Sequence, residues 1–235
     1  MKRTYFLLSY LLLFSAAVSA QQRRGYQPSI SVGIQVVQPE GEFRDFYTGN
    51  PAGISAQLVG PLAGSPILVG VSGAWTSMDS KTEDIYVNVG SDKNGNEYYE
   101  DGTMSVKSNN NRYLMVGRLN PFPGGFQLYG DALVGFETFS TKTRIELKDG
   151  SSTTAPDKHR HHWDAGATLG WAVGTKIKLS NDLFLEGRFE KLEGGRTTFV
   201  DPETIEVTDE GELSFETVQS KTNKWTVQVG ISFEF

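Results

Sequence analysis

The sequence predicts an all-β fold, an eight-stranded antiparallel up-and-down barrel, and three observations lead to it. Eight segments alternate apolar and polar side chains with a period of two, as strands with two different faces do. The connections between these segments alternate between short and long. Glycine supplies 26 of the 235 residues and aromatic residues another 11%, and the glycine share is well above the usual ~7%. This composition favours strands and turns.

The first half of the chain contains four of these segments. The first, at 29–36, has isoleucine or valine at every second position, opposite serine, glycine and glutamine. Three more follow at 52–59, 67–76 and 112–119. The last of these is the least regular, because Leu114 and Val116 fall on its polar face.

The second half alternates more cleanly. Its segments lie at 126–138, 163–177, 183–190 and 225–235. In the segment 163–177 the polar face is almost entirely small, from Gly166 to Gly174. Small residues on one face leave room for long side chains from other strands, so we expect the barrel interior to be filled rather than open.

The connections predict which ends of the strands lie together. Short ones, rich in Pro, Gly, Asn and Asp, occupy 60–66, 120–125 and 178–182. Long polar ones occupy 39–51, 78–111, 140–162 and 192–223. Short turns at one end and long loops at the other are typical of a transmembrane barrel with periplasmic turns and extracellular loops. Strands of roughly 8–15 residues also fit the ~9–11 that a tilted spanning strand needs.

Alternation alone does not say which face points inward, and a soluble lipocalin-type barrel would bury the apolar one. Two features favour lipid outside: aromatic residues stand near the strand ends, and charges of both signs lie deep in the polar faces. The charged positions expected to form a salt-bridge network in the lumen are Arg118, Asp131, Glu137, Lys176, Glu186, Arg188 and Glu190. Arg118 with Asp131, and Lys176 with Glu186, should be near-diagonal neighbours across short turns. A gated polar path or a ligand clamp is the alternative, but buried charges need partners whatever their function.

The chain divides into two parts. Residues 1–20 have a charged start, an apolar stretch and the small residues Val18-Ser19-Ala20, which predicts a cleaved secretory signal peptide and export from the cytoplasm. Residues 21–235 form the barrel domain. A formal net charge of −6 argues against nucleic-acid binding, and the absence of cysteine excludes disulfides, thiolate metal sites and a Cys nucleophile.

Three weaker motifs carry possible chemistry. All three histidines fall in His159–His162, where a solvated loop is favoured over a metal site. Asp92–Asn96 resembles the start of a calcium loop, but Glu97 and Thr103 stand where glycine and glutamate are needed, so Asn94-Gly95 is read as a hairpin turn joining flanks that extend the sheet. A hydrolase would pair a histidine with Ser140 or Ser180, and no nucleophile motif supports it. We expect no catalytic, cofactor-binding or metal-binding residues.

The chain resembles the eight-stranded outer-membrane β-barrels of Gram-negative bacteria, the OmpA/OmpX-like family with an outer membrane protein beta-barrel domain. The stretches that carry the resemblance are Val18-Ser19-Ala20, Gln38 to Phe43, Leu128 to Phe136 and the terminal Val229 to Phe235. The terminal stretch is the specific one. The resemblance implies that Val227, Val229, Ile231, Phe233 and Phe235 are read by the barrel-assembly machinery during insertion.

These observations predict a non-enzymatic outer-membrane barrel with a plugged polar lumen and a structural or surface-interaction role. The loops 78–111 and 192–223 carry net charges of −4 and −6, whereas 140–162 carries +2, so a protein partner at the extracellular loops is expected beside the outer-membrane lipid. The alternatives are a barrel subunit of a secretion or surface-assembly complex, a porin-like path, and an outer-membrane hydrolase.

Overall fold

The chain folds into a closed antiparallel barrel of eight strands, seen in a computed structural model that describes residues 26–47, 49–63, 65–91, 97–147, 159–201, 204–207 and 213–235. The predicted signal peptide lies outside these residues. The barrel strands are β1 (Ser29–Pro39), β2 (Ala52–Pro61), β3 (Ile67–Ser91), β4 (Glu97–Leu119), β5 (Phe126–Leu147), β6 (His159–Lys178), β7 (Leu183–Gly194) and β12 (Lys224–Glu234). Each strand pairs with its neighbour in sequence, and β1 pairs with β12 to close the sheet.

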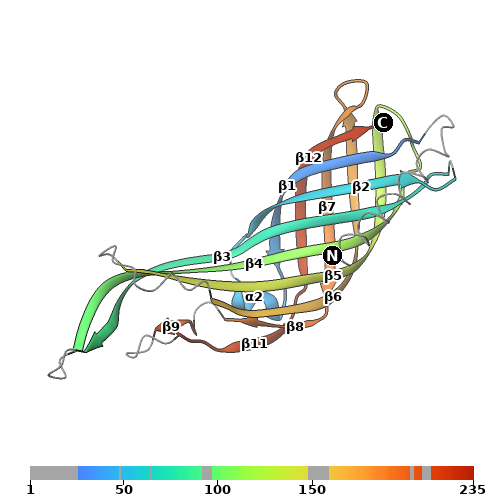
Figure 1. Cartoon of the computed structure of the whole chain (residues 1–235). Coiled ribbons are helices and arrows are strands. Elements are labelled where there is room, and N and C mark those ends of the chain that lie inside the picture. The colour runs from blue at the N-terminus through green and yellow to red at the C-terminus, as the bar shows by residue number, and fades with distance from the viewer. Residues whose placement is uncertain are drawn as a thin grey trace, which may run out of the picture.

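The register of the pairs gives the barrel its tilt. The register partners can be followed once around the barrel, starting at Thr175 on β6. This path returns to β6 at Ala165, which lies farther from the short turns than Thr175 does. A stagger of this size tilts the strands by about 40° from the barrel axis. Figure 1 shows the strands running obliquely around the barrel, with the C-terminus at the end opposite the long extension.

The alternation of burial is the reverse of that in a soluble barrel. On β1 the apolar Ile34 is 69% exposed, whereas its polar neighbour Gln35 is 2% exposed. The same pattern continues through β12, where Val227, Val229 and Ile231 are exposed and Thr226 and Ser232 are buried. The apolar faces therefore form the outer wall, and the polar faces line the interior, as the charged positions in the sequence predicted.

The outer wall is an apolar belt with aromatic side chains near both ends. Tyr113 and Phe136 are register partners whose ring centroids lie 5.3 Å apart. Trp171, Phe189 and Trp225 form a second group, with the rings of Phe189 and Trp225 stacked at 4.9 Å. At the turn end, Phe126 and Phe235 are exposed. Trp163 lies farther out on β6 than this second group.

Three strands are much longer than predicted. The pairing of β3 with β4 extends to Ser91 and Glu97, and β5 follows β4 as far as Leu147. The result is a twisted ribbon that projects well beyond the barrel (Figure 1). The expected extension through the flanks 85–89 and 104–106 is confirmed, but most of 78–111 and part of 140–162, expected as loops, are strand. The hairpin turn at Asn94-Gly95 lies outside the described residues.

The loops at this end also carry structure that the sequence did not predict. Between β1 and β2 lies the short helix α2 (Glu42–Phe46). The connection from β7 to β12 forms β8 (Arg196–Val200), β9 (Glu206–Val207), β10 (Leu213–Ser214) and β11 (Thr217–Lys221), with β8 paired to β11. These elements pack over the inward face of the sheet through two apolar clusters. One contains Phe43, Tyr47, Met78, Phe139 and Phe199, and the other Met104, Val106, Val200 and Ile205.

The three short connections are as tight as predicted. Leu179 and Ser180 amides both donate to the Leu183 carbonyl in the turn between β6 and β7. Among the described residues, no helix has both the length and the apolarity needed to cross a membrane.

Candidate functional site: the charged barrel interior

All seven charged residues expected in the lumen are buried, and they come from four strands. Arg118 lies on β4, Asp131 and Glu137 on β5, Lys176 on β6, and Glu186, Arg188 and Glu190 on β7. Their positions follow from the period of two, because each occupies the polar face of its strand. The backbone therefore directs all of them into one interior.

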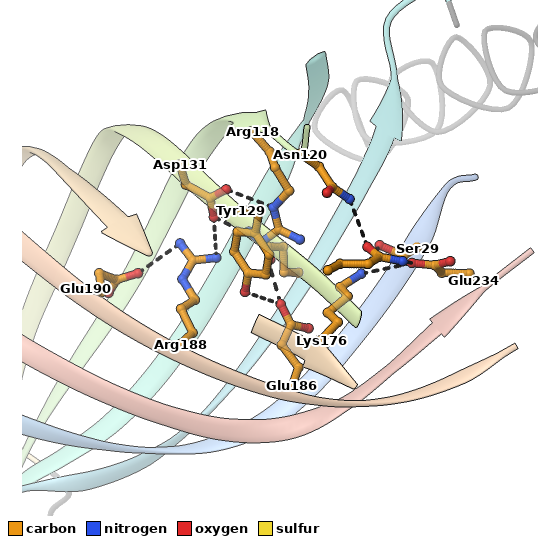
Figure 2. A network of polar contacts seen from close by, with 12 residues as sticks. Ser29, Arg118, Asn120, Tyr129, Asp131, Lys176, Glu186, Arg188, Glu190 and Glu234 are labelled. Carbon is orange, nitrogen blue, oxygen red and sulfur yellow. Dashed lines mark hydrogen bonds and ion pairs between the residues drawn. The ribbon is translucent and has the colours of Figure 1, made fainter. Parts of the chain in front are cut away.

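Arg118 lies at the centre of the largest group (Figure 2). Its Nε donates to Asp131 Oδ1 at 2.8 Å and its Nη2 to Asp131 Oδ2 at 3.0 Å, a bidentate pair. The two residues are direct register partners on β4 and β5, rather than the diagonal neighbours expected. The guanidinium also lies 3.5 Å from the centroid of the Tyr129 ring, and Tyr129 donates to Glu186.

A glycine makes room for this group. A Cβ at Gly174 would come within 2.3 Å of the Tyr129 ring, which packs against the bare backbone of β6. At this position the small inward face of 166–174 leaves room, as expected, for an aromatic ring and for the arginine stacked on it.

A second group continues from the first toward the extracellular end. Arg188 Nη1 lies 2.8 Å from Asp131 Oδ2, and its Nη2 donates to Glu190 at 3.1 Å. Glu190 in turn lies 2.6 Å from Arg112 Nη1. Arg112 donates to Gln35 Oε1, and the Gln35 amide donates to Thr76. Opposite charges therefore alternate along the axis, so each buried charge has a counter-charge beside it.

Lys176 lies at the turn end of the interior. It faces Glu186 across the β6–β7 pair, again directly opposite rather than diagonal. Its Nζ donates to Ser29 Oγ at 2.9 Å and lies 3.5 Å from Glu234. A small recess beside Lys176, lined also by Asn120 and Gln127, has room for roughly one water molecule.

Glu137 belongs to a separate group at the extracellular end. It pairs with Lys224 and accepts a hydrogen bond from Thr222. Asn110 donates to Glu137 through Nδ2 and accepts from Lys224 through Oδ1, at 3.2 Å each. Lys224 also lies 5.9 Å and 5.6 Å from the ring centroids of Phe43 and Phe139, at the base of the aromatic cluster.

The aromatic cluster itself closes over this ion pair. Phe43 on α2 contacts Phe139 of β5 and Phe199 of β8 edge-on, with centroids 5.7 and 5.8 Å apart. Burial raises the pKa of the Tyr47 phenol above its ordinary value, against a hydrogen bond with Ser108 that lowers it. The β1–β2 and β7–β12 connections thus meet strands β3 and β5 in one apolar cap.

Three interior residues of importance were not among the predicted site residues. Arg112 forms the ion pair with Glu190, and Lys224 forms the one with Glu137. Tyr129 stacks against the Arg118 guanidinium and donates a hydrogen bond to Glu186. Arg112 could have been found from the period of β4. Lys224 was missed because it falls between the predicted loop 192–223 and the predicted strand 225–235, whereas β12 begins at Lys224.

Among the described residues, the buried charges balance. The cations are Arg112, Arg118, Lys176, Arg188 and Lys224, and the carboxylates are Asp131, Glu137, Glu186 and Glu190. Half-buried Glu234, which contacts Lys176, supplies a fifth negative charge. A neutral interior is expected of charges that neutralise one another, whereas an ion-selective path is lined by an excess of one sign.

The weaker motifs gain no support from the described residues. No group of three His, Asp or Glu side chains that could hold a metal ion occurs among them, and the side chains of 159–162 lie outside the described part. The calcium-like stretch 92–96 also lies outside it. Ser180 is in the turn at the end of β6 opposite the histidines, about 60 Å along the strand, so the hydrolase pairing with Ser180 is wrong. Ser140 pairs in register with Trp163 beside them, but is buried.

The terminal segment lies where its pattern predicted. Val227, Val229, Ile231, Phe233 and Phe235 all point outward and are exposed. Phe235 follows β12, and its amide donates to the Pro28 carbonyl at the start of β1.

No protein-family model and no curated protein sequence matches this chain. Its structure is similar to solved outer-membrane barrels. The Neisserial surface protein A aligns over 88% of this chain and 97% of its own, at 7% identity and a TM-score of 0.43. A major outer membrane protein of Thermus thermophilus aligns over 88% and 99%, at 16% and 0.46. OprG of Pseudomonas aeruginosa aligns over 92% and 99%, at 11% and 0.44. The all-β, eight-stranded antiparallel barrel fold itself follows from the pairing of the strands and from the closure of β1 on β12.

Proposed function

We propose that this chain is a non-enzymatic outer-membrane barrel with a plugged interior that presents an extracellular ribbon, formed by β3 and β4, to a protein partner. The outward apolar belt supports the membrane location, since a side chain such as Ile34 gains nothing from exposure to water. A closed sheet is also the one β arrangement that satisfies every backbone polar group in lipid. The signal peptide at 1–20 and recognition of the terminal strand by the assembly machinery belong to the same proposal.

The plugged interior is supported by the packing of its side chains. The groups around Arg118 and Glu190 cross the lumen as continuous contacts between facing strands, and the aliphatic cluster of Val59, Leu114, Val116, Leu133 and Leu192 fills the space beside them. At the extracellular end the aromatic cluster covers the interior as an apolar cap. A barrel of eight strands has an interior just wide enough for such side chains.

Planar-bilayer recording tests the plug. The purified barrel should show no steady unitary conductance, because ions would have to pass through packed ion pairs. A reproducible open-channel current in the wild-type protein would contradict the plug, and would favour the porin-like interpretation.

The observation that carries the interaction role is the ribbon of β3 and β4. It extends beyond the barrel, and Tyr86, 76% exposed, stands near its end with Tyr98 and Tyr99 also exposed. Tyrosine is among the residues that most often carry the binding energy of protein interfaces, and here several tyrosines stand exposed on a projecting strand pair. The carboxylates of Glu83, Asp84 and Asp101 surround them, so the partner surface should be basic.

Photocrosslinking in the intact outer membrane tests this role. A photoreactive amino acid in place of Tyr86 should yield a discrete protein adduct, whereas the same residue at lipid-facing Val134 should yield none. If a correctly folded barrel gives no adduct at Tyr86, Tyr98 or Tyr99, the interaction role is contradicted and a purely structural role is favoured. A stoichiometric adduct with another envelope protein would favour the alternative of a subunit in a surface-assembly complex.

A further inference from the structure

Lys224, Asn110 and Glu137 form a buried group of three side chains at the extracellular end of the lumen. They are 1%, 3% and 0% exposed, respectively. Lys224 Nζ donates to Asn110 Oδ1 at 3.2 Å, and Asn110 Nδ2 donates to Glu137 Oε2 at 3.2 Å. The same Glu137 oxygen pairs with Lys224. An amine, an amide and a carboxylate therefore contact one another pairwise.

The three residues come from different sides of the barrel. Asn110 lies on β4 and Glu137 on the neighbouring β5, whereas Lys224 begins β12, four strands away from β4 in either direction around the closed sheet. Lys224 and Asn110 are also 114 residues apart in sequence. Their contact therefore crosses the lumen and joins opposite walls of the barrel.

The amine of Lys224 lies close to the amide carbon of Asn110. One carbonyl bond of about 1.2 Å separates Asn110 Cγ from Oδ1, so Lys224 Nζ is within about 4.4 Å of Cγ. Reacting atoms must approach to about 3–3.5 Å, which a shift of about 1 Å achieves. The Glu137 oxygen contacts both nitrogens, the one placed to attack and the one placed to leave.

The surroundings exclude water from this group. The ring centroids of Phe43 and Phe139 lie 5.9 and 5.6 Å from Lys224 Nζ, and both rings belong to the apolar cap. Burial in apolar surroundings disfavours the charged forms of an amine and of a carboxyl group. Transfer of one proton from Lys224 to Glu137 leaves both groups neutral, and only a neutral amine has a lone pair that can attack a carbonyl carbon.

We propose that Lys224 and Asn110 form an intramolecular isopeptide bond, with Glu137 as the proton carrier. The Nζ lone pair attacks Cγ, a bond forms between Nζ and Cγ, and the bond between Cγ and Nδ2 breaks. Of the two protons that Nζ loses, one passes through Glu137 to Nδ2, which leaves as ammonia, and the other stays on Glu137. The carboxyl group thus ends neutral beside the new amide, so no unpaired buried charge remains. The ion pair in the structure is the state before this reaction.

The other buried lysine among the described residues lacks this arrangement. Lys176 lies 3.5 Å from Glu234 at the turn end of the lumen. The Asn120 amide, which lines the same recess, donates to Gln127 instead of contacting a carboxylate. The reaction is therefore expected at Lys224 and not at Lys176. Its product would staple the barrel mouth beneath the apolar cap, independently of the partner surface proposed for the ribbon.

Peptide mass spectrometry of the full chain purified from the outer membrane tests the proposal. Trypsin does not cleave after a lysine whose amine is acylated, so the bond should yield peptide 108–112 joined to peptide 222–235. The joined species should weigh about 17 Da less than the two peptides together, the mass of the ammonia displaced by the amine. This peptide is decisive, whereas the mass of the whole chain is not, because cyclisation of an N-terminal glutamine also releases ammonia.

A time course separates the folded state from the unfolded one. In chain freshly refolded from urea, the joined peptide should accumulate after folding, because the reaction depends on contacts that the fold provides. Chain kept in urea for the same time should contain none.

Variants of the three residues identify the reacting groups. Asn110→Ser removes the amide carbon but keeps the Lys224–Glu137 pair, and it should give no joined peptide. Asn111→Ser is the matched control, because Asn111 is half-buried on the outward face of the same strand, and it should join as the wild type does. Glu137→Gln should slow joining by about 100-fold or more, since an amide cannot carry the proton.

Three results would overturn the proposal. The first is the absence of the joined peptide from folded wild-type barrel, and the second is joining through Asn109 or Asn111, which fragmentation of the peptide distinguishes. The third is joining at the wild-type rate in folded Glu137→Gln. If gel mobility before and after boiling shows that Glu137→Gln does not fold, the comparison of Asn110→Ser with Asn111→Ser decides.

Discussion

At the residue scale, the interior holds buried charges, and each of them is tolerated only while its counter-charge is present. Glu137 is fully buried, and its partners are Lys224, Thr222 and Asn110. Desolvating a carboxylate costs several kcal/mol, and that cost is offset only while the counter-charge remains. Removing one member of such an ion pair should therefore destabilise the barrel more than removing both members.

The Lys224→Met variant should lower the free energy of unfolding by about 3–5 kcal/mol. The Lys224→Met, Glu137→Gln double variant should recover much of that loss, because no uncompensated charge is left. Urea titration of the barrel in phospholipid vesicles measures both values. Equal destabilisation of the single and double variants would show that the pairing is not what matters at this position, and exposed Lys178→Met serves as the control.

A steric prediction follows from Gly174. Alanine there would press on the Tyr129 ring, so Gly174→Ala should destabilise the barrel by about 1–3 kcal/mol. Gly117, on the outward face of β4, has nothing within 4 Å of the same built Cβ, and Gly117→Ala should be nearly neutral. Unfolding titrations of the two variants side by side check the difference. Similar losses would argue against close packing of Tyr129 on β6.

At the element scale, the apolar cap joins α2, β5 and β8, and its stability should depend on pH. Burial raises the folded-state pKa of Tyr47 above the unfolded value near 10. A phenol with a raised pKa contributes its full stability below pH 10 and loses it as the pH rises beyond that value. The cap should therefore open in alkaline solution while the barrel beneath it stays closed.

Near-ultraviolet circular dichroism between pH 9 and pH 12 measures this opening. The aromatic signal of the wild type should fall above about pH 10, and Tyr47→Phe should retain more of its signal, since phenylalanine does not ionise. Identical pH profiles for the two proteins would show that Tyr47 does not couple the cap to pH.

The elements also show what the sequence could predict. A period of two in β1 or β6 was enough to assign each strand and its inward residues, because side-chain direction follows directly from backbone pleat. The upper halves of β3 and β4 were harder. There both faces are polar or mixed, as around Ser105 and Asn109, so the alternation disappears although the backbone pairing continues. The folds of α2 and β8 depend on contacts such as Phe43 with Phe199, which no local pattern reveals.

At the scale of the whole molecule, the apolar face of the two-residue alternation points outward along the belt and inward beyond it. Along the belt, Val134 and Ile231 point outward and polar residues point inward. Beyond it, inward Met104 and Val106 form an apolar cluster with Val200, and Lys107 points outward. Closure and the choice of inner face were predictable, whereas the register was not: Arg118 and Asp131 are direct partners rather than diagonal neighbours. The exact ion pairs were not predictable either, because they depend on which strands face each other across the lumen.

The central claim is that the apolar face of every strand contacts lipid, and the absence of cysteine makes a direct test practicable. Single cysteines placed along β12, from Thr226 to Ser232, can carry spin labels in the barrel reconstituted in vesicles. Labels at Val227, Val229 and Ile231 should be accessible to oxygen dissolved in the lipid, and labels at Thr226 and Ser232 should be shielded from it. A reversed or absent alternation in oxygen accessibility would contradict the account.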